Sequence, residues 1–501
     1  MTNKTGYCFS KIVFLLMAVT IGTFGQQAKP SGQPISVDPK NPHYLLWKNQ
    51  PTVLVGSSEH FSSVIDPDFD FKRYLATVSS IGLNHTRIFL GDYAEEEGDF
   101  GMVDNPLAPA PGHFLAPWAR SSVPGYALGG TKFDLDHWNP AYFERLHAFM
   151  HEAEERNIIV EVVFFFVGPK WDELPLNPRN NINQTTPVDH LHYLTLDNGN
   201  ILARQEAYCR KLIRELNQYN NVIFNIVNEP WYENQEHPGF ASQPPHATKL
   251  WIGKVSDWIT DEESKLPKKH VISADISNQG PVISDQDLNG PYARLSIFNV
   301  HYDDNADSLR LNPNISRVFS FNETGFNGVE DQQYRTQGWN YMLSGGGIYD
   351  NLDFSFSVGH EDGSSQPRFT TKTYDTGGSA ALRGQLKILL DFMNSIPFAS
   401  MTPDNSVVVG GADEWRALTW DGHAYAIWFP GDGPIEPRLL LPAGNWRFEW
   451  VDILSGKVAT EVDRSAEWVR VVHGMRGGGG VALRIFPDES AAVPAQAPGA
   501  P

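Results

Sequence analysis

Eight short apolar runs alternate with helical patterns between residues 43 and 395, and this alternation constrains the fold more than any other feature of the chain. The runs are residues 52–57, 85–90, 158–166, 222–228, 270–275, 296–301, 318–323 and 347–353. Strands that alternate with helices form parallel sheets. Eight such units favour a closed (β/α)8 TIM barrel over an open sheet.

The segments between these runs carry the spacing of helices that pack one face onto a sheet. Apolar residues recur at helical intervals within 71–78 and within 143–150, and the second segment follows the helix-start signal Asn139-Pro140. Two connections, 91–136 and 167–198, are unusually long and rich in Pro, Gly or Asn. Loops of that size are uncommon in a compact domain unless they are functional.

The pattern changes to short alternating strands in residues 401–487. The expected strands are residues 415–420, 424–429, 445–452, 468–472 and 481–485. Turn residues such as Asp421-Gly422 and Ser455-Gly456 separate several of them, which predicts a small antiparallel β-sandwich. Residues 488–501 are expected to be a disordered tail, because the last eleven residues are all Ala, Val, Pro, Gln or Gly.

The amino terminus is typical of a secretory signal peptide over residues 1–25. Lys4 and Lys11 precede the apolar stretch 12–24, which is too short to span a bilayer comfortably. No later apolar run approaches the length of a membrane span, so a secreted or periplasmic protein is expected. A formal net charge of −20 without a basic cluster makes nucleic acid an unlikely partner. Cys209 is expected to be a buried structural thiol.

Two glutamates each end an apolar run, 94 residues apart. Glu229 follows the run 222–228 within Asn228-Glu229-Pro230, and Glu323 ends the run 318–323. The carboxyl ends of the strands carry the active sites of TIM-barrel enzymes. A pair of carboxyl groups there is what acid/base hydrolysis of a glycosidic bond requires.

On these residues the chain resembles the clan A glycoside hydrolases, a large group of retaining (β/α)8-barrel enzymes. Their acid/base follows an Asn at the end of the fourth strand, and their nucleophile ends the seventh. The resemblance implies that Glu229 is the acid/base, that Glu323 is the nucleophile, and that Asn228 binds the sugar 2-hydroxyl. It implies a carbohydrate substrate, either an oligosaccharide or a polysaccharide, and no cofactor. Residues 401–487 resemble the accessory β-domain of many such enzymes by layout alone.

Arg87 lies in the second run, where the family has an arginine beside the nucleophile. A buried arginine is costly unless it is paired with a carboxylate, so we expect it to pair with Glu323. His301 ends the sixth run, where the family usually has a His and, two positions on, a Tyr that binds the nucleophile. Here that position is Asp303, so either Tyr302 or His301 takes the role of the tyrosine.

Further residues near strand ends are candidates for binding sugar hydroxyls. Glu59 and His60 follow the first run, Asp353 closes the eighth, and His360-Glu361 lies shortly beyond. The family commonly has a tryptophan at the end of the eighth strand, which this chain lacks. Trp231, next to Pro230, is expected to line the cleft instead.

The two tryptophans of the long connections, Trp118 and Trp171, either stack on sugars or merely pin the loops. Two other function classes compete with a retaining glycosidase. One is a non-catalytic carbohydrate-binding barrel. The other is a metal-dependent hydrolase, suggested by His190-Leu191-His192, but no further ligand cluster accompanies this motif, so no metal site is predicted.

Overall fold

The computed structural model describes Met1 and residues 32–166, 168–231, 243–366, 368–370, 375–465 and 469–488. All but the first residue of the signal peptide expected over residues 1–25, and all but the first residue of the expected tail 488–501, lie outside these residues. The first residue of the expected strand 468–472 lies outside them as well.

Eight parallel strands close into a barrel, as the sequence predicts. They are β4 (Leu54–Ser58), β5 (His85–Phe89), β8 (Ile159–Phe165), β9 (Val222–Val227), β10 (Ile272–Asn278), β11 (Ile297–His301), β12 (Val318–Glu323) and β13 (Ile348–Leu352). Each strand pairs with its successor in the chain, and β13 pairs with β4 to close the ring. Each of the eight expected runs overlaps one of these strands, and β4 and β10 extend beyond the expected ends, to Ser58 and Asn278.

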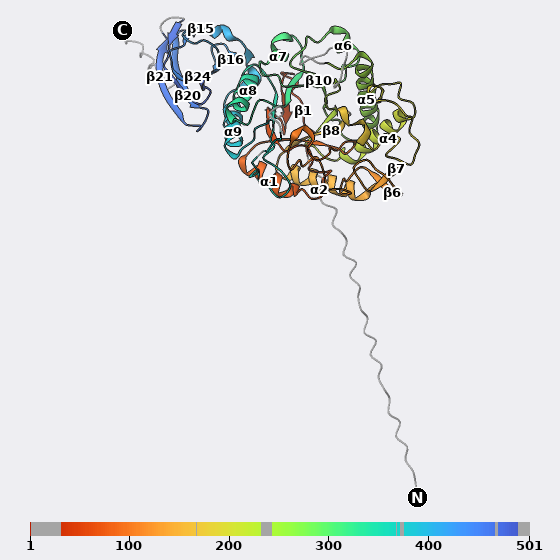
Figure 1. Ribbon diagram of the computed structural model, residues 1–501. Coiled ribbons are helices and arrows are strands. Elements are labelled where there is room, and N and C mark those ends of the chain that lie inside the picture. Colours follow the sequence, from red (N-terminus) through yellow and green to blue (C-terminus); the bar gives the residue numbers. More distant parts are fainter. Residues whose placement is uncertain are drawn as a thin grey trace, which may run out of the picture. The chain divides into compact units, whose positions relative to one another are not determined.

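A helix follows every barrel strand before the next one begins (Figure 1). The helices are α1 (Phe71–Ile81), α2 (Pro140–Glu155), α3 (His190–Tyr193), α4 (Ile201–Leu216), α5 (His246–Ser264), α6 (Asp285–Asn289), α7 (Asp307–Leu311), α8 (Asp331–Leu343) and α9 (Ala380–Asn394). Local signals set their starts: Asp70 caps α1 through its side chain, and Asn139 caps α2 ahead of Pro140. Cys209 is buried on α4, as expected.

A small sheet that the sequence did not predict covers the amino end of the barrel. Its strands are β1 (Ser36–Val37), β2 (Leu45–Trp47) and β3 (Gln50–Thr52). Ile35 and Leu45 join a buried cluster with residues at the beginnings of the barrel strands, such as Leu54 and Ile348. The barrel therefore has a packed floor opposite the ends that carry Glu229 and Glu323.

The two long connections have structure of their own and pack together. The first contains the short 3₁₀ helix η1 (Asp99–Gly101) and a hairpin of β6 (Trp118–Pro124) and β7 (Thr131–Trp138). The second contains η2 (Gly168–Glu173) and α3. Phe133 of β7 forms two backbone hydrogen bonds with the second connection. Its N–H donates to the Asn180 carbonyl, and its carbonyl accepts from the Ile182 N–H.

The tryptophans of these connections pin them. Trp118 is 1% exposed and packs on Tyr208, with ring centroids 4.8 Å apart. The Trp171 indole N–H donates to the carbonyl of Val188 at 2.9 Å, and its ring packs on Tyr193. Of the two alternatives left by the sequence, this packing favours the pinning of loops.

The C-terminal strands form an antiparallel sheet of six, covered on one face by a sheet of three. The strands are β14 (Thr402–Pro403), β15 (Val408–Gly410), β16 (Arg416–Trp420), β17 (Ala424–Phe429), β18 (Gly433–Ile435), β19 (Arg438–Leu440), β20 (Gly444–Asp452), β21 (Val458–Ser465), β22 (Val469–Val471), β23 (Gly474–Arg476) and β24 (Val481–Pro487). The large sheet has the order β14-β16-β17-β24-β20-β21, and the small one β15-β19-β22. The fold class is thus a TIM barrel followed by a small antiparallel β-domain.

Both faces of the six-stranded sheet contribute to a hydrophobic core. On β17, Tyr425, Ile427 and Phe429 belong to the core between the two sheets. The alternate residues of β17, including the buried Trp428, belong to the same core as the barrel. Since successive side chains of a strand point to opposite faces, the β-domain shares one core with the barrel and has a second of its own.

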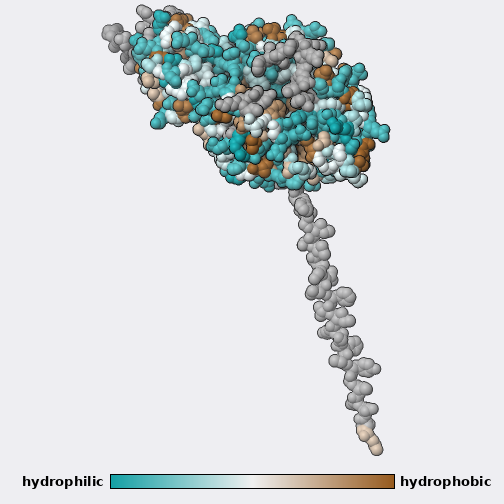
Figure 2. All heavy atoms as spheres, in the orientation of Figure 1, coloured by the Kyte–Doolittle hydropathy of each residue, from teal (hydrophilic) through white to brown (hydrophobic). Residues whose placement is uncertain are grey.

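Hydrophilic residues cover most of the face in Figure 2, where apolar residues are scattered rather than gathered. Among the helices of the described residues, none is both long and apolar enough to cross a membrane.

Candidate active site

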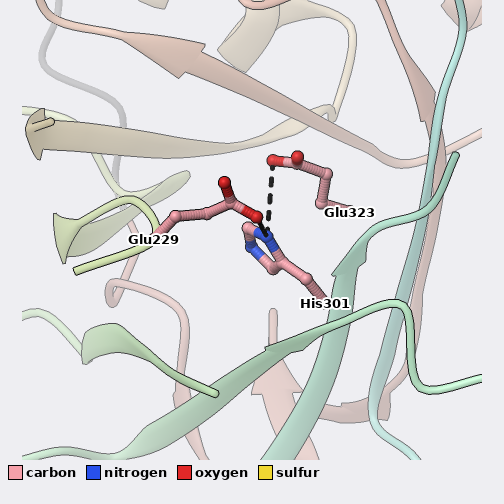
Figure 3. Close-up of side chains that lie close together, drawn as sticks. All are labelled: Glu229, His301 and Glu323. Carbon is pink, nitrogen blue, oxygen red and sulfur yellow. Dashed lines mark hydrogen bonds and ion pairs between the residues drawn. The ribbon is translucent and has the colours of Figure 1, made fainter. Parts of the chain in front are cut away.

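Glu229 and Glu323 meet at the carboxyl end of the barrel, with His301 between them (Figure 3). Glu323 is the last residue of β12, Glu229 follows β9 by two residues, and His301 is the last residue of β11. One oxygen of each carboxylate and one ring nitrogen of His301 all lie within 4.8 Å of one another. Parallel strands that end at one edge of the barrel bring these distant residues together.

Glu323 is buried and is held by two donors, one on β5 and one directly after β11. Arg87 Nη1, from β5, donates to Oε2 at 2.7 Å, and the Tyr302 hydroxyl donates to Oε1 at 2.8 Å. Arg87 is completely buried, and its guanidinium lies over the Phe61 ring, 4.7 Å from the centroid. The expected pairing of Arg87 with Glu323 is therefore present.

Glu229 has fewer contacts and is more accessible, with 14% of its side chain exposed. His301 Nδ1 lies 2.9 Å from its Oε1. The backbone of Glu229 has φ of 42°, in the left-handed region that non-glycine residues rarely adopt. This turn aims the carboxylate across the barrel mouth toward Glu323 (Figure 3).

Asn228, immediately before Glu229, is also fixed by Arg87. The guanidinium Nη2 donates to the Asn228 side-chain carbonyl oxygen at 2.6 Å. Because the arginine occupies the oxygen, the amide nitrogen is the end of Asn228 that can act as a donor.

The backbone shows which residue contacts Glu323 in the manner of the family tyrosine. The pairing of β11 with β12 shifts register between Val300 and His301, and Tyr302 has φ of 52°. This bulge and left-handed turn bring the Tyr302 hydroxyl to Glu323, although Tyr302 directly follows His301 in the chain. His301 Nδ1 lies closer to Glu229, at 2.9 Å, than to Glu323, at 3.7 Å.

Asp275, on β10, lies beneath the two glutamates and was not among the predicted site residues. Its Oδ2 lies 3.1 Å from Arg87 Nη2 and 3.0 Å from His301 Nε2, and it accepts from the Glu229 backbone N–H at 3.1 Å. Its Oδ1 accepts from two buried asparagines of neighbouring strands. The available signal was its position at the end of the fifth apolar run, since the other site residues also end such runs.

The charged groups of this cluster change one another's pKa values. Burial alone would lower the pKa of His301, but the carboxylates of Glu323 and Asp275 outweigh burial and raise it to about 10. Burial would raise the pKa of Asp275, but the cations of His301 and Arg87 hold it well below its ordinary value. Burial raises the pKa of Glu323 and Glu229 raises it further, whereas His301 and Arg87 oppose the rise.

The remaining predicted residues have partners within the protein. Both oxygens of Glu59 accept bonds from the backbone and hydroxyl groups of Ser62 and Ser63. Asp353 is fully buried and accepts from Arg383 Nη1 at 2.7 Å. Trp231 is 4% exposed and packs edge-on against His301, with centroids 5.5 Å apart.

These contacts separate the predicted residues into two groups. Asn228, Arg87, His301, Tyr302 and Trp231 surround the two glutamates. Glu59 and Asp353 are engaged in buried polar contacts that hold the loops after β4 and β13, and their binding of a substrate stays a prediction.

The described residues contain one group of three side chains close enough to hold a metal ion, namely Glu229, His301 and Glu323. A metal would need a neutral ring nitrogen of His301. Both ring nitrogens instead lie within 3.0 Å of carboxylate oxygens, which raise the pKa of the ring. The donor set therefore fits a carboxylate pair bridged by imidazolium better than a metal centre. His190 and His192 do not belong to this group.

No protein-family model matches the sequence. No curated protein matches it either.

Many solved structures share the fold of the chain. A glycoside hydrolase family 5 structure from Bacteroides vulgatus has a TM-score of 0.60 at 13% identity and covers 91% of this chain and 93% of its own. A structure described as a glycoside hydrolase has the same score and identity, with 91% and 97% covered. A second Bacteroides vulgatus protein, assigned to the glycoside hydrolases, has a TM-score of 0.64 at 13% identity, with 92% and 84% covered. At this identity the likeness establishes the fold, over the barrel and the β-domain together.

Proposed function

We propose that this chain is an exported, retaining glycoside hydrolase that cleaves β-glycosidic bonds by double displacement. The observation that carries the proposal is the approach of the two carboxylates, whose oxygens lie within 4.8 Å of each other. Retaining enzymes hold their carboxyl groups about 5–5.5 Å apart, and inverting enzymes about 6.5–9.5 Å apart, to leave room for a water molecule. The names of the structures with this fold support the same reaction class.

The surroundings of the glutamates support their separate roles. Glu323 accepts bonds from Arg87 and Tyr302, which stabilise a carboxylate anion, so we assign it as the nucleophile. Glu229 is more exposed, and Arg87 pairs with Glu323 rather than with Glu229, so we assign Glu229 as the acid/base.

The reaction proceeds in two steps. Glu229 donates its proton to the glycosidic oxygen while a Glu323 oxygen forms a bond to the anomeric carbon and the bond to the leaving group breaks. Glu229, now a carboxylate, takes a proton from water as the water oxygen attacks the anomeric carbon and releases Glu323. The Asn228 amide nitrogen is the donor for the sugar 2-hydroxyl, a contact that strengthens as positive charge develops on the ring.

The experiment is a screen of aryl glycosides, followed by proton NMR of the product formed first. Turnover with release of the β-anomer from a β-glycoside is the expected result. Release of the α-anomer would show inversion. Binding of oligosaccharides without turnover on any glycoside would favour a non-catalytic carbohydrate-binding barrel. Activity should survive EDTA, since the proposed reaction uses no metal.

Export rests on the signal-peptide pattern of residues 1–25. Expression of the full chain in a bacterial host should place the protein in the periplasm or medium, with a new amino terminus near Gly25. Mass spectrometry of the mature chain checks this expectation. An intact amino terminus on protein recovered from the cytoplasm would contradict it.

A further inference from the structure

One buried carboxylate, that of Asp275, contacts three groups that each determine the geometry of a glutamate in the proposed active site. Its Oδ2 is 3.1 Å from Arg87 Nη2, 3.0 Å from His301 Nε2 and 3.1 Å from the backbone nitrogen of Glu229. These groups come from three different regions of the chain, and no other side chain described here lies this close to all three.

Each of the three groups either contacts one of the two glutamates or belongs to it. Arg87 donates to Glu323 at 2.7 Å, and His301 Nδ1 lies 2.9 Å from Glu229. The third group is the backbone of Glu229 itself, whose left-handed conformation is costly for a glutamate. The bond from its N–H to Asp275 stabilises this conformation.

Asp275 is itself held rigidly. Its Oδ1 accepts from the side-chain amides of Asn225 and Asn299, each at 3.1 Å. It is completely buried, and the register of β10 against β11 shifts immediately after it, between Asp275 and Ser277. This bulge changes the local course of β10 directly after Asp275, and bulges near active sites commonly aim a side chain.

We propose that Asp275 is a positioning residue for both glutamates. It positions Glu229 through the Glu229 backbone and the His301 ring, and it positions Glu323 through the Arg87 guanidinium. Its negative charge also keeps His301 protonated, so that Nδ1 donates to Glu229 while Nε2 forms an ion pair with Asp275. The consequence for rate rests on the proposed function, whereas the consequence for His301 does not.

The test compares Asp275→Asn with a matched control. Asn has nearly the same shape as Asp but lacks its charge, so it should release His301 and loosen Arg87. Asp350→Asn is the control, because Asp350 is also a buried aspartate on a barrel strand but contacts Ser58 and His85 rather than the three groups that Asp275 contacts. Asp275→Glu, which keeps the charge but displaces it, serves as the second variant if Asp275→Asn does not fold.

The first readout is the titration of the His301 ring by NMR, assigned with His301→Gln. The ring should stay protonated through pH 8 in the wild type, in Asp350→Asn and in Asp275→Glu. In Asp275→Asn it should lose its proton at least one pH unit earlier than in the wild type. An unchanged titration in Asp275→Asn would overturn the proposal.

The second readout is the dependence of rate on the leaving group. Misplacement of the acid should reduce kcat/KM about 100-fold for alkyl glycosides, whose leaving groups need protonation, and roughly tenfold for dinitrophenyl glycosides. The same pattern is expected for Asp275→Glu, because its carboxylate is misplaced. Equal losses for both substrates, as a general loss of structure would give, would contradict positioning. If the wild type hydrolyses no glycoside, the proposed function fails and the NMR titration alone decides the role of Asp275.

Discussion

At the scale of single residues, the two glutamates differ in their surroundings, and this difference predicts which one is labelled covalently. A 2-fluoro sugar with a good leaving group should form a stable adduct on Glu323, because Arg87 and Tyr302 support its anion. Peptide mapping by mass spectrometry identifies the labelled residue. An adduct on Glu229 would overturn the assignment.

Variants of the same two residues provide the complementary measurement. Glu229→Ala should still be labelled by sugars with very good leaving groups, because these need little protonation. Glu323→Ala should be labelled by none, because the attacking oxygen is gone. Full labelling of Glu323→Ala at another residue would show that the nucleophile is elsewhere.

The protonation of His301 predicts how the stability of the protein depends on pH. Its pKa is raised to about 10 in the folded state by Glu323 and Asp275 against the effect of burial, compared with about 6.5 when unfolded. The folded state therefore binds more protons between these values. The stabilisation is fully present below about pH 6.5 and is lost as pH rises toward 10, by at most about 1.4 kcal/mol per pH unit.

Urea unfolding of the wild type and of His301→Gln at pH 6, 8 and 9.5 measures this contribution. The difference in the free energy of unfolding between the two proteins should shrink as pH rises. A constant difference would mean that His301 is neutral in the folded protein.

The sequence predicted the residues that end strands better than the contacts between them. Glu229, Glu323 and Arg87 could be located because a charged residue within or after an apolar run is conspicuous. Asp275 ends such a run too, but its role depends on three partners that only the closed barrel brings together. The contact of Tyr302 with Glu323 depends on a bulge, which no spacing in the sequence reveals.

At the scale of elements, the packing around β4 can be tested with two glycines, one in a closely packed position and one in an open position. A β-carbon at Gly56 of β4 would lie 2.2 Å from Asp350 Oδ1 and 3.0 Å from the His85 carbonyl oxygen. Gly56→Ala should therefore destabilise the protein by about 1–3 kcal/mol through overpacking. The midpoint of thermal or urea unfolding measures the change.

Gly384→Ala is the matched control. Gly384 is exposed on α9, and a β-carbon there would have no neighbour within 4 Å. Because alanine has a higher helix propensity than glycine, this variant should raise the free energy of unfolding by about 0.8–1 kcal/mol. If both substitutions changed the free energy of unfolding equally, a β-carbon at Gly56 would not clash with Asp350 and His85.

The barrel strands and the helices α1 and α2 could be predicted because their apolar patterns are regular. The sequence did not predict the small sheet of β1–β3 or the hairpin of β6 and β7. Strands of two or three residues are too short to show a period, and the hairpin lies in a connection whose Pro and Gly content resembles an irregular loop.

At the scale of the whole molecule, the β-domain and the barrel are predicted to unfold together. Ala426 and Trp428 of β17 belong to the hydrophobic core of the barrel, and Arg335 of α8 donates to Gly478 of the β-domain. A truncation after Ser395 should therefore fold poorly, because it exposes apolar surface of the barrel. Circular dichroism and size-exclusion chromatography would check this. A truncated barrel that folds well and stays monomeric would contradict the prediction.

Single substitutions test the same interface without removing residues. Trp428→Ala should lower the free energy of unfolding by about 3–5 kcal/mol, because Trp428 is 2% exposed within the shared core. Trp420→Ala, at a tryptophan that is 40% exposed, should change it little. In calorimetry both proteins should show one transition, and two separate transitions would mean that the barrel and the β-domain are independent.

The place of β24 in the large sheet has a consequence for synthesis. This strand comes almost last in the chain but lies between β17 and β20, so the sheet over the barrel cannot be completed before residue 481 is made. At about 5–20 residues per second, the ribosome needs several seconds, roughly 4–17 s, to travel from the end of the barrel to this strand. During that time the nascent barrel carries an uncovered apolar face, which chaperones can recognise. Under the proposed export, this delay would leave the chain incompletely folded until it has crossed the membrane.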